Sequence, residues 1–519
     1  MTISILNMFP SARTLILQLS ILAAVRATPQ ISWNPCNETE FPSAIPNECG
    51  TLEVPQDYTD PDSKPLSLEL LRVPALTQPS NGSILFNFGG PGEPARGTLS
   101  AYGPILQQLT GLQFDLVAFD PRGTGNTLPF SCYTNELDTL AYMLERTPAN
   151  VSDTTLGRVW ARGDVNGNHC LKNANETISL LSSTFVARDL ISVVDALGED
   201  GLLRYWGLSY GTTLGVTVAS MFPDRIDKMV LDGVQNPHEY YNGVADIQEW
   251  TDSDRVFSGL FTSCIEAGDR CSLTSLNQTA AELEQSVWDL IDEIKFNPIS
   301  LGDYVFDYSE LKGAIAAAFY AIDAWPNLAD QLTVLLSGTA EDHPELFNSG
   351  GATSQVAVST TTQSLAGIHC VDRRVRASFD EFSEATEDLY NTSRFYGDLT
   401  SALTADCAQW KIEPKEPFQG DLYNIEVENP VLIIGNTFDG QTSIVSARNI
   451  SASFPDSKVL EVHGYGHASI SLPSLCTVQE VSKYWTTGTL PEYGRVCEVD
   501  ALPYMNQTWA DVLEELGSR

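Results

Sequence analysis

The segment Leu203-Arg-Tyr-Trp-Gly-Leu-Ser-Tyr-Gly211 contains the pattern G-x-S-x-G between a short apolar run and a longer run with helical spacing that ends near Met221. The apolar run predicts a buried strand, and the longer run predicts a helix. A sharp turn between such a strand and helix holds the serine hydroxyl out at the top of a sheet. Glycine is needed on both sides of that turn because a Cβ there would collide with neighbouring backbone. The segment therefore predicts Ser209 as a nucleophile.

Strand-like and helix-like runs alternate on both sides of this segment. Two early β-like runs lie near residues 51–54 and 66–73, and residues 188–197 and 472–484 have helical spacing. Further buried strands are predicted at residues 83–88, 114–119, 228–231, 430–434 and 458–462. Strands that alternate with helices pair in parallel through right-handed crossovers. The sequence therefore predicts an α/β fold with a mostly parallel sheet flanked by helices.

The alternation is interrupted between residues 236 and 425. Helices are predicted at residues 250–267, 280–294 and 311–336, whereas residues 349–363 are rich in Gly, Ser and Thr and predict a loop. Runs typical of buried strands are missing from this part of the sequence. We therefore expect a mainly helical lid at 236–425, inserted between an N-terminal part of the core at 28–235 and a C-terminal part at 426–519.

A serine nucleophile needs a base, and the base needs an acid that orients it. After a nucleophile turn of this kind, the acid comes next along the chain and the histidine comes last. His467 lies in a loop after a predicted strand and is the expected base, with His463, closer to the strand end, as the alternative. Asp439 follows another predicted strand and is the expected acid, with Asp232, one strand earlier, as the alternative.

The reaction also requires donors for the negative oxygen of the transition state. The backbone N–H of Tyr210, directly after the nucleophile, is the first expected donor. The second is expected from the loop Gly89-Gly-Pro-Gly92, where missing side chains let the backbone approach the substrate. Within this loop we favour Gly90, with Gly89 as the alternative.

The charge balance argues against partners that are themselves strongly negative. The chain of 519 residues carries 29 Lys and Arg against 67 Asp and Glu, a formal net charge of −38. Nucleic acids and anionic membranes are bound by basic surfaces, so we expect neither as a partner. The sequence contains no spacing typical of a metal site and no nucleotide-binding loop, so we expect no metal and no cofactor.

The N-terminus predicts export. Residues 1–27 carry Arg13, an apolar run at 15–25, and small residues at Val25 and Ala27 before an expected cleavage site. The run is about half the length of a membrane span, so a signal peptide is favoured over a short signal anchor. Asparagines of the pattern Asn-x-Ser/Thr, which accept N-linked glycans, occur at Asn37, Asn81, Asn150, Asn175, Asn277, Asn391, Asn449 and Asn506. We expect a secreted glycoprotein.

The cysteines agree with an oxidising environment. All ten lie after residue 27, and none forms a CxxC pair or a set with zinc spacing. Such a pattern predicts disulfides rather than a metal site. We expect pairing between neighbours in chain order, above all between Cys264 and Cys271.

Taken together, these motifs resemble those of α/β-hydrolase-fold serine peptidases of the tripeptidyl aminopeptidase-like and proline iminopeptidase group. Besides the segment around Ser209, the resemblance is carried by Phe88-Gly-Gly-Pro-Gly92, Phe119-Asp-Pro-Arg-Gly-Thr-Gly125, Thr184-Phe-Val-Ala-Arg-Asp189, Met229-Val-Leu-Asp-Gly233, Gly464-Tyr-Gly-His467 and the tail Gly488-Thr-Leu-Pro-Glu-Tyr-Gly-Arg-Val-Cys497. The resemblance implies an α/β-hydrolase fold whose C-terminal part is TAP-like. It also implies removal of residues from free peptide N-termini, with acidic lid residues binding the substrate's α-ammonium group.

Three acidic residues early in the lid are candidates for that ammonium site: Glu239, Asp246 and Glu249. The chain also departs from the pattern of the group. Phe88 stands where His is frequent, and Glu93-Pro94 replaces a pair of small residues beside the oxyanion loop. These changes leave the expected catalytic residues in place and bear on substrate preference.

The sequence thus predicts a secreted serine aminopeptidase that works through an acyl-enzyme on Ser209. One alternative keeps the same catalytic residues and acts as an esterase, or as a pathway-specific hydrolase, on a small metabolite. The other is a catalytically silent binding protein, which a complete Ser/Asp/His set argues against.

Overall fold

The computed structural model describes residues 30–302, 304–347 and 352–518, so the expected signal peptide at 1–27 lies outside the described residues. Its centre is a ten-stranded sheet of order β1-β2-β3-β5-β4-β6-β7-β10-β11-β12. The strands are β1 (Asn34–Pro35), β2 (Glu48–Pro55), β3 (Pro65–Val73), β4 (Ser83–Asn87), β5 (Asp115–Phe119), β6 (Leu203–Leu208), β7 (Ile226–Asp232), β10 (Leu432–Phe438), β11 (Lys458–Tyr465) and β12 (Val496–Glu498). Pairing is antiparallel from β1 to β5 and parallel from β5 to β12. The predicted α/β fold with a mostly parallel sheet is confirmed.

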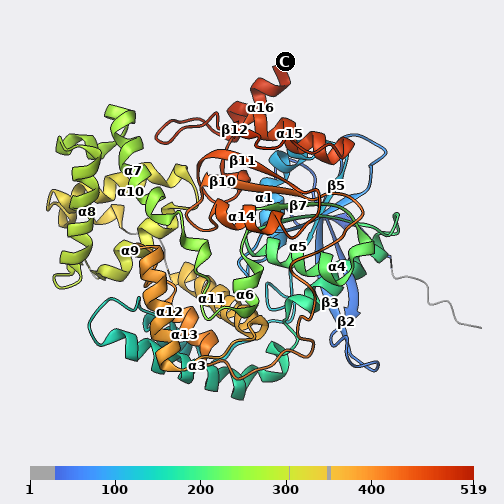
Figure 1. The fold of residues 1–519 in the computed structure, drawn as a ribbon, viewed down its shortest axis with the longest axis horizontal. Coiled ribbons are helices and arrows are strands. Elements are labelled where there is room, and N and C mark those ends of the chain that lie inside the picture. Colours follow the sequence, from blue (N-terminus) through green and yellow to red (C-terminus); the bar gives the residue numbers. More distant parts are fainter. Residues whose placement is uncertain (1–29, 303, 348–351, 519) are drawn as a thin grey trace, which may run out of the picture.

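Helices cover both faces of the sheet (Figure 1). One face carries α1 (Ala95–Leu109), α15 (Leu475–Thr487) and α16 (Trp509–Ser518), and the other carries α4 (Ser183–Leu197), α5 (Tyr210–Met221) and α14 (Ile444–Ser451). Side chains alternate between the faces along each strand: Ile84 and Phe86 pack under α1, whereas Leu85 packs toward α4 and α5. The strands are apolar on both faces because both faces are buried.

Residues 237–408 form a helical layer beside the sheet (Figure 1). Its elements are α6 (Pro237–Asn242), α7 (Ser253–Ala267), α8 (Ala280–Ile294), the hairpin β8 (Ile299–Leu301) and β9 (Tyr304–Phe306), α9 (Tyr308–Ala318), α10 (Trp325–Leu336), α11 (Ala352–Asp372), α12 (Phe379–Thr392) and α13 (Ser401–Ala408). Part of this layer has its own hydrophobic core, in which Phe257, Trp288 and Phe395 pack together. We call this layer the lid.

Two local predictions in the lid are wrong. The helix expected over 311–336 is two helices, because the chain turns between α9 and α10 at Tyr320 and Ala321. The loop expected over 349–363 is largely helix α11, which begins at Ala352. Ser and Thr cost only about 0.5 kcal/mol each in a helix, and the second half of α11 is held by burial of Ile368 and by a disulfide at Cys370.

The chain before the nucleophile also contributes to the helical layer. Helices α2 (Glu136–Leu144) and α3 (Thr155–Ile178) follow β5, and α3 lies beside α13. The contact is close, since a Cβ added at Gly163 would lie 2.4 Å from the carbonyl oxygen of Ala405. Residues 155–197 are long and apolar enough to cross a membrane, but 83% of their most apolar window is buried inside the protein. They therefore behave as core helices.

Five disulfides join the cysteines in chain order, which confirms that expectation. The pairs are Cys36–Cys49, Cys132–Cys170, Cys264–Cys271, Cys370–Cys407 and Cys476–Cys497. Each disulfide closes a loop of fewer than 40 residues, so each stabilises one local region.

Candidate active site

The turn between β6 and α5 presents Ser209. Its backbone has φ 56° and ψ −127°, a conformation that is uncommon for a residue other than glycine. The flanking glycines are required by space: a Cβ at Gly207 would lie 2.1 Å from the carbonyl oxygen of Gly211, and one at Gly211 would lie 2.5 Å from that of Asn87. The sequence pattern therefore folds into a tight turn that exposes the serine side chain at the carboxyl end of the sheet.

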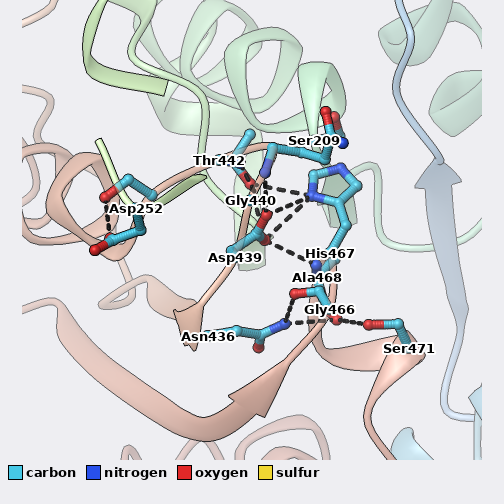
Figure 2. A network of polar contacts seen from close by, with 12 residues as sticks. Ser209, Asp252, Asn436, Asp439, Gly440, Thr442, Gly466, His467, Ala468 and Ser471 are labelled. Carbon is cyan, nitrogen blue, oxygen red and sulfur yellow. Dashed lines mark hydrogen bonds and ion pairs between the residues drawn. The ribbon is translucent and has the colours of Figure 1, made fainter. Parts of the chain in front are cut away.

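His467 and Asp439 meet beside this turn, in the loops that follow β11 and β10. The Nδ1 atom of His467 lies 3.1 Å from each carboxylate oxygen of Asp439. This contact places the ring proton on Nδ1 and leaves Nε2 as the basic nitrogen. Ser209 and His467 line the same cavity, and Figure 2 shows them as neighbours.

Asp439 is fully buried and surrounded by donors. It accepts hydrogen bonds from the backbone N–H groups of Gln441, Thr442 and Ala468 at 2.8–3.0 Å. Burial alone would raise the pKa of Asp439, but the charge of His467 and these hydrogen bonds hold that pKa below its usual value. Asp439 therefore stays ionised and can stabilise a protonated His467.

The loop that carries His467 is fixed from two sides. The side-chain amide of Asn436 donates to the carbonyl oxygens of Gly466 at 2.8 Å and Ala468 at 2.9 Å (Figure 2). From the lid, the carbonyl oxygen of Tyr320 accepts the backbone N–H of His467 at 2.8 Å, and Ala321 forms a β-bridge with Gly466. Core and lid together thus set the position of the imidazole.

Asp232 and His463, the alternatives to Asp439 and His467, make other contacts. Asp232 is fully buried and accepts the N–H and the hydroxyl of Ser469 at 2.8 and 2.6 Å, and burial raises its pKa to about 6. It thereby anchors the loop just after His467. His463 lies on β11, exposed to solvent, with Nδ1 3.2 Å from the hydroxyl of Thr437, and it lines a different cavity.

The expected oxyanion donors are both beside Ser209. Tyr210 is the first residue of α5, so its N–H lies at the positive end of that helix. Its side chain is turned into the core, where the hydroxyl contacts Ser183 Oγ at 2.6 Å. In the glycine loop, the N–H of Gly89 already donates to Asn87 at 3.0 Å. Gly90 is therefore the better second donor.

Two cavities meet at Ser209. The larger has a volume of about 770 Å³ and is lined by Ser209, His467 and the start of α16. The smaller has a volume of about 420 Å³ and is lined by Ser209 and by lid residues that include Glu249. The residues that line both are Gly90, Ser209, Tyr320 and Leu365. These four residues form a neck, and a bond held beside Ser209 would have one cavity on each side.

The three acidic candidates are placed differently. Glu249 lines the smaller cavity and is 7% exposed, and its Oε1 has no hydrogen-bond partner among the described residues. Asp246 lines the same cavity; its Oδ2 is paired with Arg373 at 2.5 Å and with His369 at 3.3 Å, while its buried Oδ1 has no hydrogen-bond partner among the described residues. Glu239 lines neither cavity, because it accepts the backbone N–H of Gln248 at 2.8 Å within the lid. The structure therefore places Glu249 and Asp246, but not Glu239, in a cavity that Ser209 also lines.

The charge state of Glu249 follows from this environment. Burial, together with the nearby charge of Asp246, raises its pKa well above the usual value for a glutamate. A carboxylate in this position gains from a cationic ligand, which would restore the stability that burial removes.

Sequence reasoning missed Tyr320 and Leu365. Both belong to lid segments without a recognisable motif, and one lies where a continuous helix was expected. The rings of Tyr320 and His467 are perpendicular to each other, with their centres 5.3 Å apart. Arg122, in the motif Asp-Pro-Arg-Gly, is fully buried and pairs with Asp189 at 2.7 Å.

Comparison with known proteins agrees with this geometry. Residues 82–278 match the family described as alpha/beta hydrolase fold, and residues 393–497 match the family described as TAP-like protein. The tripeptidyl aminopeptidase of Streptomyces lividans is 26% identical over 506 residues, covering 93% of this chain and 89% of that protein. Serine protease Hip1 of Mycobacterium tuberculosis is 26% identical over 498 residues, covering 90% of this chain and 91% of that protein. Carboxylesterase B of Mycobacterium tuberculosis is 27% identical and covers 90% of each.

Proposed function

Because this chain belongs to the α/β-hydrolase-fold serine hydrolases and carries a TAP-like C-terminal region, we propose that it is a serine aminopeptidase. In this proposal it releases residues or short peptides from free peptide N-termini. Ser209, His467 and Asp439 are its catalytic residues, and Tyr210 and Gly90 donate to the oxyanion.

The proposed reaction uses the neck between the two cavities. His467 takes the proton of Ser209 as the hydroxyl attacks the carbonyl carbon of the scissile bond. The N–H groups of Tyr210 and Gly90 stabilise the oxygen that becomes negative. His467 then gives its proton to the leaving amine, and water attacks the resulting acyl-enzyme. Asp439 orients the imidazole and stabilises its charged form throughout.

The observation that carries the aminopeptidase proposal is the unpartnered carboxylate oxygen of Glu249. It is buried and lies in the same cavity as Ser209. A free α-ammonium group is a small cation that would pair with this oxygen through a charge-assisted hydrogen bond. Anchoring the N-terminus there sets which carbonyl reaches Ser209. A blocked N-terminus has no charge to offer and would leave Oε1 of Glu249 without a partner.

The test compares peptide amides that are identical except for a free or an acetylated N-terminus. Purified enzyme and the Ser209→Ala variant are assayed in parallel, so that turnover by contaminants is subtracted. We expect cleavage of free-amine substrates, at least tenfold weaker cleavage of acetylated ones, and none by the variant. Equal cleavage of both substrates would overturn the proposed role of Glu249.

A second candidate function is an esterase, favoured by the similarity to carboxylesterase B at 27% identity. It would use the same Ser209, His467 and Asp439. A short-chain ester in the same assay separates the two functions: turnover of the ester without turnover of any peptide amide would replace the peptidase by an esterase. The buried carboxyl group of Glu249 favours the peptidase, since a neutral ester offers it no cation.

We also propose that the protein is secreted and N-glycosylated. Five disulfides agree with an oxidising compartment, and each of the eight asparagines in glycan acceptor patterns is exposed. Expression with the native N-terminus in a eukaryotic host should yield protein in the medium. Its apparent mass should fall on treatment with an endoglycosidase, and intracellular protein of unchanged mass would contradict the proposal.

A further inference from the structure

The two cavities take opposite sides of the scissile bond, an assignment that rests on the proposed function. Glu249 lies in the smaller cavity, so the N-terminal, acyl part of the substrate belongs there. His467 lines the larger cavity and not the smaller one. Because His467 must protonate the leaving amine, the leaving fragment belongs in the larger cavity.

The larger cavity has one sign of charge. Glu93 follows the glycine loop of the core, and Asp323 lies on the lid. Both residues line this cavity and are exposed to solvent. Neither Lys nor Arg occurs among the described residues that line it. A basic side chain would therefore be attracted by two carboxylates here without competition from a Lys or Arg, whereas an acidic side chain would be repelled by both.

The walls also suit the stem of a long basic side chain. Phe88, Tyr102 and Trp509 line the cavity, and the indole N–H of Trp509 donates to the carbonyl oxygen of Ile470 at 2.6 Å, which fixes the ring. Aromatic faces bind both aliphatic stems and cationic groups.

We propose that Glu93, supported by Asp323, selects a lysine or arginine in the leaving fragment. The selection acts on the residues after the scissile bond and is separate from recognition of the N-terminus by Glu249.

The experiment uses three peptides that share their N-terminal part and differ only in the first residue after the scissile bond: lysine, norleucine or glutamate. An exposed ion pair contributes at most about fivefold to binding. We expect kcat/KM to be about fivefold higher for lysine than for norleucine, and lower still for glutamate. The lysine-to-norleucine ratio should fall to about one in the double variant Glu93→Gln, Asp323→Asn.

A matched control removes a carboxylate that lies outside both cavities. Asp330 is exposed on α10 and lines neither cavity, so Asp330→Asn should keep the lysine-to-norleucine ratio of the wild type. A ratio near one in the wild type, or an unchanged ratio in the double variant, would overturn the proposal. Because every comparison is a ratio within one protein, a general loss of activity does not imitate the expected result.

A second measurement needs no turnover. Binding of N-acetyl-lysyl-alanine amide and N-acetyl-norleucyl-alanine amide, which have no free α-ammonium group for Glu249, to the Ser209→Ala variant is compared by calorimetry, with and without the two carboxylate substitutions. Tighter binding of the lysyl peptide that disappears with the substitutions supports the proposal, and equal binding contradicts it. If no peptide is hydrolysed, the aminopeptidase function fails, while this binding result still decides the charge preference of the cavity.

Discussion

Replacing Glu249 by glutamine should lower activity and raise stability at the same time. The substitution keeps the shape of the side chain and removes its charge. A hydrogen bond to a charged group contributes about 1.5–3 kcal/mol, which corresponds to a drop of roughly 10- to 160-fold in kcat/KM for substrates with a free N-terminus. Substrates with an acetylated N-terminus do not use this bond, so their kcat/KM should change little.

The stability effect has the opposite sign and depends on pH. The pKa of Glu249 is higher in the folded protein than in the unfolded chain, because burial disfavours the charged form. Glu249 therefore binds its proton more tightly in the folded protein than in the unfolded chain. As pH rises above the unfolded pKa of about 4.3, the loss of this proton progressively lowers the stability of the wild type. Glutamine does not ionise, so Glu249→Gln should have the higher Tm near pH 8, and this advantage should vanish near pH 4.

Both quantities are measured on the same two preparations. Initial rates with matched free and acetylated peptides give kcat/KM, and calorimetric scans at pH 4 and pH 8 give Tm. A variant that loses activity equally on both substrates would show a damaged site rather than a lost ammonium contact. A variant that is less stable at pH 8 would refute the claim that burial disfavours the charged form of Glu249.

Three further predictions concern other parts of the molecule. Asp439→Asn should lower kcat about 10⁴-fold, because His467 loses the partner that holds its tautomer; Asp232→Asn is the control in the same peptidase assay, and an equal loss there would assign the acid to Asp232. Gly163→Ala should cost about 1–3 kcal/mol in denaturant unfolding, because the new Cβ would lie 2.4 Å from Ala405 backbone on the neighbouring helix, and a cost near zero would contradict this packing. Lys312→Met should cost about 3–5 kcal/mol, because it leaves the fully buried Asp398 without its cation; adding Asp398→Asn should recover part of that loss, and no recovery would rule out the charge as its cause.

The sequence predicted the parts of the site that depend on local backbone geometry. The turn at Ser209 requires glycines at fixed positions, and the loops of Asp439 and His467 each follow an apolar strand, so the local pattern and the sheet together bring them to one edge. The acidic residues of the lid carry no such signal. Glu239 and Glu249 are ten positions apart with similar neighbours, and only the packed structure shows that one is bonded to Gln248 while the other lines a cavity.

Helix α11 was missed for a related reason. Its first half is rich in Ser and Thr, residues that favour loops when the chain is considered alone. Leu365, on this helix, lines both cavities, so part of the candidate site depends on a segment whose helical state is set by tertiary packing rather than by propensity. The break at Tyr320 follows the same rule, since its carbonyl oxygen bonds to the loop of His467.

That bond between Tyr320 and His467 limits how this enzyme can be re-engineered or diversify. A lid inserted in a hydrolase would be an exchangeable module if it touched the core only through its two linkers. Here its backbone hydrogen-bonds with the loop that carries the base, at Tyr320 and again at the bridge between Ala321 and Gly466. A chimera with a foreign lid would misplace the imidazole unless it preserved the backbone contacts of Tyr320 and Ala321. An antibody fragment that displaced the lid would inactivate the enzyme without contacting Ser209.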